Sequence, residues 1–228
     1  IPELRALGES LFSQCEARLP FLALRKPEVY RRTPDWTPQA AQPLVPDEPV
    51  TVLSAAQDAG RKICDAYLLA RGLAPQPLRE DEQTELLKTL LARPRRRELE
   101  QASYTLLFGG LSLAALTHLT RHRMQSLCPP QLLQNIRYDR YVLPQSVRDK
   151  GMEARYRSAF ELAGQAAAQL RDRGADESAL CYLMLSGQTV PVLTTMNAGE
   201  LYVFFRLRCC TRAQWEIRDA ACQALAAL

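Results

Sequence analysis

The densest pattern in the sequence is NAGELYVFFRLRCCTRAQWEIR, residues 197–218. Asn197 and Glu200 have the spacing of a capping box, in which the asparagine side chain accepts a hydrogen bond from a first-turn amide and the glutamate reaches back. This spacing predicts a helix that begins at Ala198. The apolar residues that follow predict that the helix continues to about Leu225.

Arg208 stands out in this segment because it lies on an otherwise apolar stripe. It follows Asn197 by about three helical turns, which places the two residues on nearly the same face. A guanidinium in such a place needs a partner, either a carboxylate of the protein or a bound anion. A helix N-terminus is also a favourable place for a phosphate. The pattern leaves both interpretations of Arg208 open, a structural ion pair and a ligand contact.

The second informative segment is LTRHRMQSL, residues 119–127. We predict a helix from about residue 112 to residue 127, because Pro129-Pro130 cannot continue it. A basic last turn complements the helix dipole, so basic residues here are by themselves a weak indication of a ligand site. Those that lie three to four residues apart on one side are His118, Arg121 and His122.

The rest of the chain predicts a mixed α and β fold. Expected strands span Val50–Leu53 and Ser103–Phe108, and Gly109-Gly110 is expected to break the second. Further helices are expected at 3–19, from an N-cap at Ser54 to Ala70 or Leu73, at 81–92 and at 153–173, with a short extended piece at 141–144. Residues 34–49 are rich in proline and predict a linker. We therefore divide the chain into an arm, 1–47, and a domain, 48–228.

Composition limits the classes of partner. The chain has 228 residues, of which 47% are hydrophobic and 24% charged, as in an ordinary globular domain. Its net charge of +4 suits an anionic small ligand as well as nucleic acid. The run Arg95-Arg96-Arg97 is more typical of a solvated turn, so nucleic acid is not expected. The longest apolar run, Leu106–Leu119, is too short to span a bilayer, so no membrane partner is expected.

The seven cysteines form no C-x-x-C pair, and only two histidines exist to complete a metal site. We therefore expect no zinc or other metal. An odd and scattered set of cysteines is typical of reduced thiols in the cytosol, which predicts a cytoplasmic protein.

Together the two segments resemble flavin-dependent thymidylate synthases. That family carries R-H-R-x-x-S-x-N-E-x-S-x-R-Y and, later, N-A-R-E-L-x-(H/N)-F-x-x-L-R-x-x-x-x-A-Q-W-E-I-R. The first motif is matched at Arg121, His122, Arg123 and Ser126. The second is matched at Asn197, Ala198, Glu200, Leu201, Phe204, Leu207, Arg208 and throughout Ala213–Arg218. The resemblance covers roughly residues 50–225.

The sequence also departs from the family pattern. Residues that replace the second half of the first motif are Cys128, Pro129, Gln131 and Leu133. Gly199 and Val203 replace the arginine and the His or Asn of the second motif, and Cys181 or Tyr182 replaces a further arginine. His118 stands where the family has glutamine. Arg137 or Arg140 could take over phosphate binding.

The resemblance implies a twisted, largely antiparallel sheet flanked by long helices, and a homotetramer with composite sites. It implies FAD-dependent reductive methylation of dUMP to dTMP, with methylenetetrahydrofolate and NADPH as co-substrates. Arg208 would hold the pyrimidine and favour its N3-ionised form, the catalytic role. The residues implied for FAD are Ser103, Arg121, His122, Arg123 and Asn197. Those implied for the nucleotide are His118, Arg121, Ser126, Arg137 and Arg208.

Two other functions remain open. The missing phosphate ligands would suit a flavoprotein of the same fold that acts on another nucleotide-like anion. The losses at Gly199 and Val203 would suit a non-enzymatic scaffold or an RNA-binding relative. Retention of Arg208 and of AQWEIR favours the two enzymatic functions.

Overall fold

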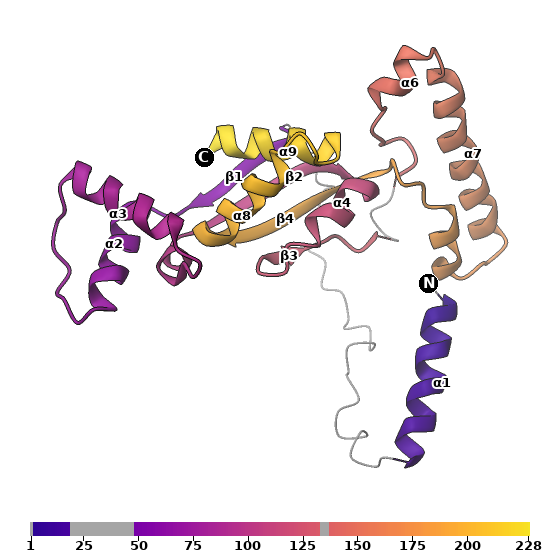
Figure 1. Ribbon diagram of the computed structural model, residues 1–228. Helices are drawn as coiled ribbons and strands as arrows, with labels where there is room; N and C mark the ends of the chain where they lie inside the picture. Colours follow the sequence, from indigo (N-terminus) through magenta and orange to yellow (C-terminus); the bar gives the residue numbers. More distant parts are fainter. Residues whose placement is uncertain (1, 19–47, 133–136) are drawn as a thin grey trace, which may run out of the picture.

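The computed structural model describes residues 2–18, 48–132 and 137–228. Its centre is a four-stranded antiparallel sheet in the order β1-β2-β4-β3 (Figure 1). The strands are β1 (Val50–Ala55), β2 (Ser103–Ser112), β3 (Ser126–Cys128) and β4 (Thr189–Asn197). The predicted fold, an antiparallel sheet flanked by helices, is confirmed.

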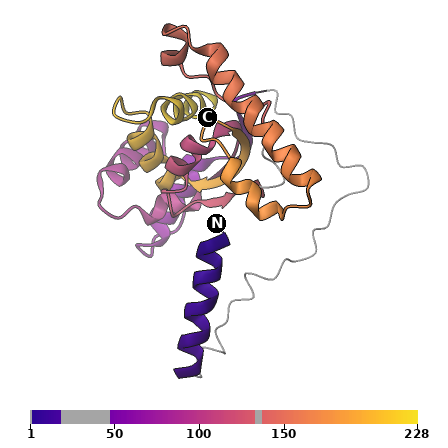
Figure 2. The same cartoon turned by 90° about the vertical axis from the view of Figure 1, so that its right-hand side faces the viewer.

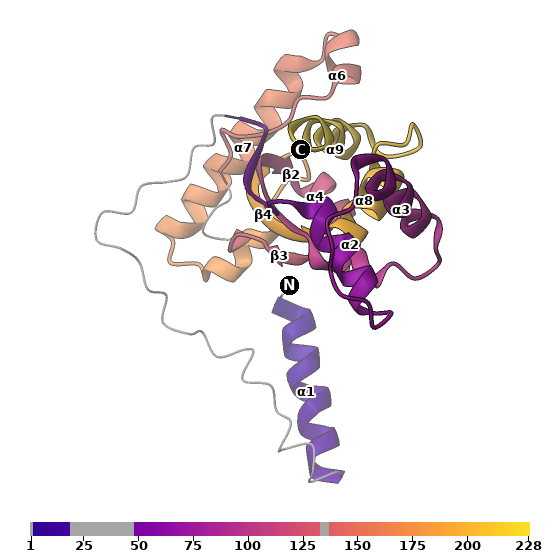
Figure 3. The same ribbon diagram turned by 90° about the vertical axis from the view of Figure 1, so that its left-hand side faces the viewer.

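The helices are α1 (Pro2–Arg18), α2 (Ala59–Leu69), α3 (Glu80–Ala92), α4 (Leu113–Leu119), α6 (Gln145–Asp149), α7 (Glu153–Asp172), α8 (Ala198–Arg208) and α9 (Trp215–Ala227), with 3-10 helices η3 (Arg97–Gln101) and η4 (Glu177–Leu183). Figures 1 and 3 show α2 and α3 at one end of the sheet and α6 and α7 at the other. In Figure 2, α1 extends away from this body. Its Glu3 accepts a hydrogen bond from Tyr182 of η4.

The main core lies on one face of the sheet, under α4, α8 and α9. Alternate residues of a strand point to opposite faces, and every second residue of β4 is buried. The buried residues of β2 and β4 are Leu106, Phe108, Leu111, Ser112, Val190, Val192, Thr194 and Met196. The opposite face carries Leu107 and Leu193, which are paired across β2 and β4 and remain partly exposed.

The sequence pattern predicts no strand at β4. Pro191 interrupts its alternating pattern, and proline lacks the N–H that a central strand donates. The structure accommodates this proline with a β-bulge, because Gly109 and Gly110 of β2 together lie opposite it. The predicted break of β2 at these glycines is therefore wrong, and the strand continues to Ser112.

Two predicted helix boundaries are wrong because strand pairing extends further than expected. Ser54 and Ala55 pair with β2 and belong to β1, so α2 begins only at Ala59. The helix predicted to reach residue 127 ends at Leu119, after which 126–128 pair with β4 as β3. The segment Arg121-His122-Arg123 therefore lies in a turn between α4 and β3 and not on a helix.

Side chains from outside the two helices fix the end of α4 and the start of α9. Gln125 Nε2 donates to the carbonyl of Leu119 (2.6 Å), and Arg208 Nη2 donates to the carbonyl of His118 (2.9 Å). The predicted single helix from Ala198 to Leu225 is two helices, because Gln214 accepts a hydrogen bond from the Ile217 amide and caps α9.

The other predicted helices, α1, α3 and α7, are confirmed to within one residue over the residues described. Gly174 follows α7 with φ of +74°, the left-handed conformation typical of a helix end. Tyr141 forms an isolated bridge with Gln188, which confirms the extended piece. Most of the predicted linker at 34–49 lies outside the described residues. Within the described ranges no helix has the length and apolar character needed to cross a bilayer.

Candidate functional site

Three side chains form a continuous hydrogen-bonded chain between α8 and the turn that follows α4. Arg208 Nε donates to His122 Nε2 at 2.9 Å, and His122 Nδ1 lies 3.0 Å from Glu200 Oε1. His122 is 6% exposed and Glu200 is 9% exposed, so water does not compete strongly for these bonds. The chain links a surface-facing guanidinium to a buried carboxylate through an imidazole.

The helical repeat of α8 explains this alignment. Glu200, Phe204 and Arg208 follow one another at intervals of four residues and share one face. The ring of Phe204 meets His122 edge-on, with centroids 5.2 Å apart and an interplanar angle of 77°. The two polar groups of α8 therefore hold the two nitrogens of one imidazole, while Phe204 supports the ring between them.

Asn197 caps α8 as predicted, because its Oδ1 accepts a hydrogen bond from the Glu200 amide at 2.9 Å. The second half of the predicted capping box is wrong. The Glu200 carboxylate does not reach back to the chain before the helix but bonds His122 instead. The sequence gives no signal for this contact of Glu200, because His122 lies 78 residues away.

The guanidinium of Arg208 is half-buried without a direct counter-charge. Among the residues that the structure describes, no carboxylate forms an ion pair with it, and Nη1 makes no hydrogen bond. Burial lowers the pKa of Arg208, and the positive charge of Arg121 lowers it further. Within the described ranges the structural ion pair that the sequence left open is not found, which favours an anionic ligand as the partner of Arg208.

The neighbouring histidines are held neutral by the same environment. Burial lowers the pKa of His118, and the charges of Arg208 and Arg121 lower it further. Burial is also the main cause that lowers the pKa of His122; Arg208 acts in the same direction, whereas the hydrogen bond and charge of Glu200 oppose it. Positive charge here therefore comes from arginine rather than from histidine.

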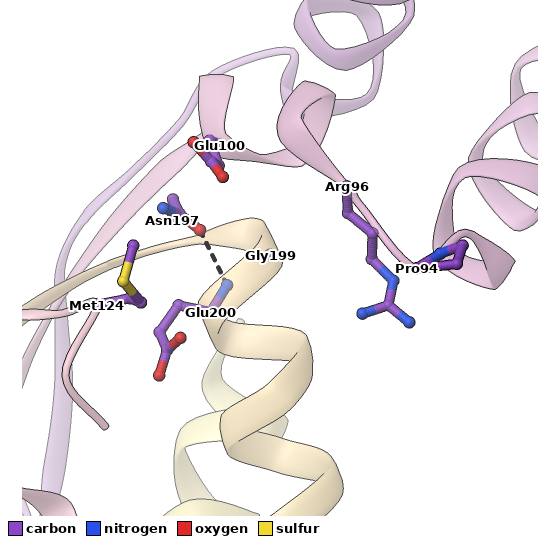
Figure 4. A pocket seen from close by; sticks show the side chains of 7 residues that line it. All are labelled: Pro94, Arg96, Glu100, Met124, Asn197, Gly199 and Glu200. Carbon is purple, nitrogen blue, oxygen red and sulfur yellow. Dashed lines mark hydrogen bonds between the residues drawn. The ribbon is translucent and has the colours of Figure 1, made fainter. Parts of the chain in front are cut away.

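A small cavity of about 140 Å³ lies beside the first turn of α8 (Figure 4). It is lined by Pro94, Arg96, Glu100, Met124, Asn197, Gly199 and Glu200. The guanidinium of Arg96 lies 4.8 Å from the centre of the Tyr202 ring, and its Nε donates to the carbonyl of Leu91 at 2.8 Å. A Cβ at Gly199 would come within 3.2 Å of Asn197 Oδ1, so glycine leaves the cap undisturbed.

Sequence reasoning missed Arg96 as a site residue. The run Arg95-Arg96-Arg97 predicts a solvated turn, and Arg95 and Arg97 are indeed exposed. Arg96 differs because it is half-buried at the cavity, stacked on an aromatic ring. The sequence around the turn gives no signal for the stacking of Arg96, because the ring of Tyr202 comes from α8.

The structure brings only some of the expected site residues together. Arg208, His122, His118 and Asn197 gather along α8. Ser103 lies beside Asn197 in the β2–β4 register, and Ser126 is exposed on β3, opposite Thr195. Arg121 and Arg123 are exposed in the turn, next to the buried His122.

Arg137 lies away from this group within one chain. Its carbonyl accepts a hydrogen bond from Gln188, which immediately precedes β4, whereas Asn197 ends that strand. Nine residues of strand span roughly 30 Å, so the two ends of β4 are well separated. The Arg137 guanidinium is engaged with Asp139, at 3.1 and 3.0 Å.

The AQWEIR segment has a structural explanation. Glu216, 9% exposed, accepts hydrogen bonds from the Ser112 amide (2.7 Å) and from Ser112 Oγ (2.5 Å). Ser112 Oγ in turn caps α4 by accepting from the Ala115 amide at 3.0 Å. Gln214 caps α9. These residues join α9 to the junction of β2 and α4, and none of their hydrogen bonds requires a ligand.

Comparison with known proteins identifies the family. A family described as "Thymidylate synthase complementing protein" matches residues 47–228. The chain belongs to this family. The resemblance to flavin-dependent thymidylate synthases that the two motifs indicate is thereby confirmed.

Two curated relatives in this thymidylate synthase family are both named flavin-dependent thymidylate synthase. The protein of Sulfolobus acidocaldarius is 36% identical over 126 residues, which cover 54% of this chain and 48% of the relative. That of Geobacter sulfurreducens is 36% identical over 157 residues, covering 66% of each chain. The matched part of the chain thus spans about half to two thirds of the length of these relatives.

Two solved structures share the fold. The UMP/dUMP methylase PolB of Streptomyces cacaoi, bound with 5-Br dUMP, has a TM-score of 0.69 at 18% identity, with 78% of this chain and 88% of PolB covered. Thymidylate synthase X of Helicobacter pylori, with FAD and dUMP, has a TM-score of 0.60 at 20% identity, with 78% of this chain and 92% of that chain covered. At these identities the likeness shows the fold alone.

Proposed function

We propose that the protein catalyses the FAD-dependent reductive methylation of dUMP to dTMP. Methylenetetrahydrofolate supplies the carbon and NADPH reduces the flavin. The observation that carries the proposal is the half-buried Arg208 guanidinium, which has no carboxylate partner among the described residues. The names of the curated relatives and of both structural neighbours support a flavin and a uracil nucleotide as ligands.

Arg208 has the properties that the nucleotide role requires. Its Nε and Nη2 are held by His122 and by the carbonyl of His118, so Nη1 would be the nitrogen that binds a ligand. A fixed cation at the pyrimidine stabilises negative charge on that ring and so favours its N3-ionised form. His118, Arg121 and Ser126 complete the nucleotide side in this proposal.

The residues at the start of α8 suit the phosphate part of FAD. The half-buried Arg96 supplies positive charge beside the cavity, and the N-terminus of an eleven-residue helix favours an anion. Ser103, Arg123 and Asn197 would hold the cofactor here. Both ring nitrogens of His122 are engaged by Arg208 and Glu200, so its implied contact with FAD would come from its main chain. FAD, when bound, supplies the hydride chemistry, and the protein supplies binding, orientation and charge.

The proposal includes a homotetramer in the cytoplasm. A cavity of about 140 Å³ is smaller than the ~300–1,000 Å³ of pockets that hold a whole ligand, so one chain would enclose only part of FAD. On the sheet face opposite the core, the paired Leu107 and Leu193 are partly exposed, which would suit packing against another copy. Arg137, at the far end of β4, would then serve the site of another subunit. Residues 48–228 form the functional domain in this proposal, with 1–47 as an arm.

A second candidate is a flavoprotein of the same fold that acts on another nucleotide-like anion. The pairing of Arg137 with Asp139 favours it, because an arginine already bound to a carboxylate is a weaker phosphate ligand. Comparing dUMP with UMP and with uridine lacking a phosphate would separate the two candidates.

FAD retention tests the flavoprotein proposal. Protein incubated with excess FAD should carry flavin through gel filtration and elute at the mass of several chains, and FAD should raise its melting temperature. Arg96→Gln should weaken FAD retention, while Arg95→Gln, at the exposed neighbouring position, should not. Colourless protein that elutes at the mass of one chain, without thermal stabilisation by FAD, would contradict the proposal.

A further inference from the structure

We infer that Glu200 is a positioning residue for Arg208. Acting through the buried imidazole of His122, it fixes the tautomer that holds the Arg208 guanidinium in place. The consequence for nucleotide binding rests on the proposed function, whereas the tautomer itself is a property of the protein alone.

Hydrogen-bond chemistry determines which nitrogen of His122 carries the proton. An arginine Nε–H can only donate, so His122 Nε2, at 2.9 Å from Arg208 Nε, must accept. A neutral imidazole that accepts at Nε2 carries its proton on Nδ1. That Nδ1–H then donates to Glu200 Oε1 at 3.0 Å. The carboxylate therefore selects the tautomer that Arg208 needs.

The surroundings of His122 disfavour the other tautomer and a different orientation of the imidazole. His122 and Glu200 are both buried, so water cannot readily replace the carboxylate as acceptor. The Phe204 ring packs edge-on against the imidazole and opposes its rotation. The amide of Glu200 is itself held by the Asn197 cap, which fixes the position of the carboxylate on α8.

Protonation of His122 would release Arg208. The charged groups that face this imidazole are Glu200 and Arg208, both from α8, and Arg121 acts in turn on Arg208. Burial and Arg208 keep the pKa of His122 below its ordinary value, so the ring is neutral at neutral pH. In its charged form Nε2 would carry a proton that faces the Arg208 Nε–H. At pH values above the lowered pKa of His122, the neutral imidazole holds Arg208 in place. As the pH falls through this pKa, the imidazole is protonated and Arg208 is released.

Two substitutions of Glu200 should therefore behave differently. Glu200→Gln keeps an oxygen that accepts from Nδ1–H but removes the negative charge. In the native protein that charge raises the pKa of His122, so the substitution should lower this pKa. Its dUMP affinity at neutral pH should stay within about threefold, and the acid loss of binding should move to lower pH. Glu200→Ala removes the acceptor, so the Nε2–H tautomer of His122 becomes populated and cannot accept from Arg208 Nε–H. The affinity for dUMP should therefore fall roughly tenfold or more at every pH.

Nitrogen NMR on protein with isotope-labelled histidine measures the tautomer directly. The chain contains two histidines, so a His118→Gln sample identifies the His122 signals. We expect a protonated Nδ1 and an unprotonated Nε2 in the native protein, and Nε2–H in Glu200→Ala. Native protein with Nε2–H, or Glu200→Ala that keeps the native tautomer, would overturn the inference.

Calorimetric dUMP titration of the FAD-loaded native, Glu200→Gln and Glu200→Ala proteins from pH 5 to 8 adds the functional measurement. If both variants lose dUMP affinity to the same extent and the pH at which binding is lost does not change, Glu200 is a structural residue and the positioning role is overturned. The predicted tautomers without dUMP binding by the native protein would refute the proposed function, while the positioning of Arg208 by Glu200 would stand.

Discussion

Arg208→Gln should abolish measurable dUMP binding while FAD retention stays close to that of the native protein. The guanidinium offers Nη1 to a ligand, and a desolvated charge contact of this kind contributes about 2–4 kcal/mol, which corresponds to a 30- to 1,000-fold weaker affinity. The partners of Arg208 in the protein are a neutral imidazole and a carbonyl group. Among the described residues no carboxylate loses its partner on this substitution, so the free energy of unfolding should fall by only about 1–2 kcal/mol.

The matched control is Arg206→Gln, an exposed arginine on the same helix. It should change neither dUMP affinity nor stability appreciably. Melting temperature, FAD occupancy and dUMP affinity are measured on both variants. A folded Arg208→Gln protein that binds dUMP as the native protein does would end the assignment. A sharp loss of stability together with loss of both ligands would identify Arg208 as a structural residue.

Glu216→Ala should produce the largest loss of stability without a direct effect on ligands. The carboxylate accepts two hydrogen bonds from Ser112, and its removal leaves the buried Ser112 amide without an acceptor. We expect a loss of about 3 kcal/mol in the free energy of unfolding, measured by urea denaturation. Glu216→Gln retains one acceptor and should lose about half as much.

Asp219→Ala is the control for this prediction. Asp219 lies on the same helix, is exposed and contacts Arg218 at 3.9 Å, an arrangement that contributes little to stability. Surface substitutions usually change the free energy of unfolding by no more than about 0.5 kcal/mol. If the unfolding free energies of Glu216→Ala and Asp219→Ala differ by less than this, the Ser112 contacts do not anchor α9.

Local signals in the sequence predict what depends on neighbouring residues. The Asn197 cap needs only the spacing to Glu200, and the end of α7 needs only Gly174, and both are confirmed. The family relationship is likewise readable from two short motifs. These features could be predicted because their physical causes lie within a few residues of the chain.

Most of the wrong predictions have a different cause, because they depend on a partner far away in sequence; the Gln214 cap that separates α8 from α9 is a local exception. α4 ends early partly because Arg208, 90 residues later, binds the carbonyl of His118. β4 was not predicted, and its Pro191 lies opposite the Gly109-Gly110 bulge of a strand that is distant in sequence. Arg96 was assigned to solvent because Tyr202, which it stacks on, comes from another element. Pattern and spacing carry no information about such contacts.

We propose above all that this chain, assembled and loaded with FAD, methylates dUMP. The direct measurement is product analysis after incubation of FAD-loaded protein with dUMP, methylenetetrahydrofolate and NADPH, with Arg208→Gln as the control. We predict that dTMP accumulates with the native protein and is absent with Arg208→Gln. Native protein that retains FAD and binds dUMP, yet forms no dTMP, would contradict the proposed reaction.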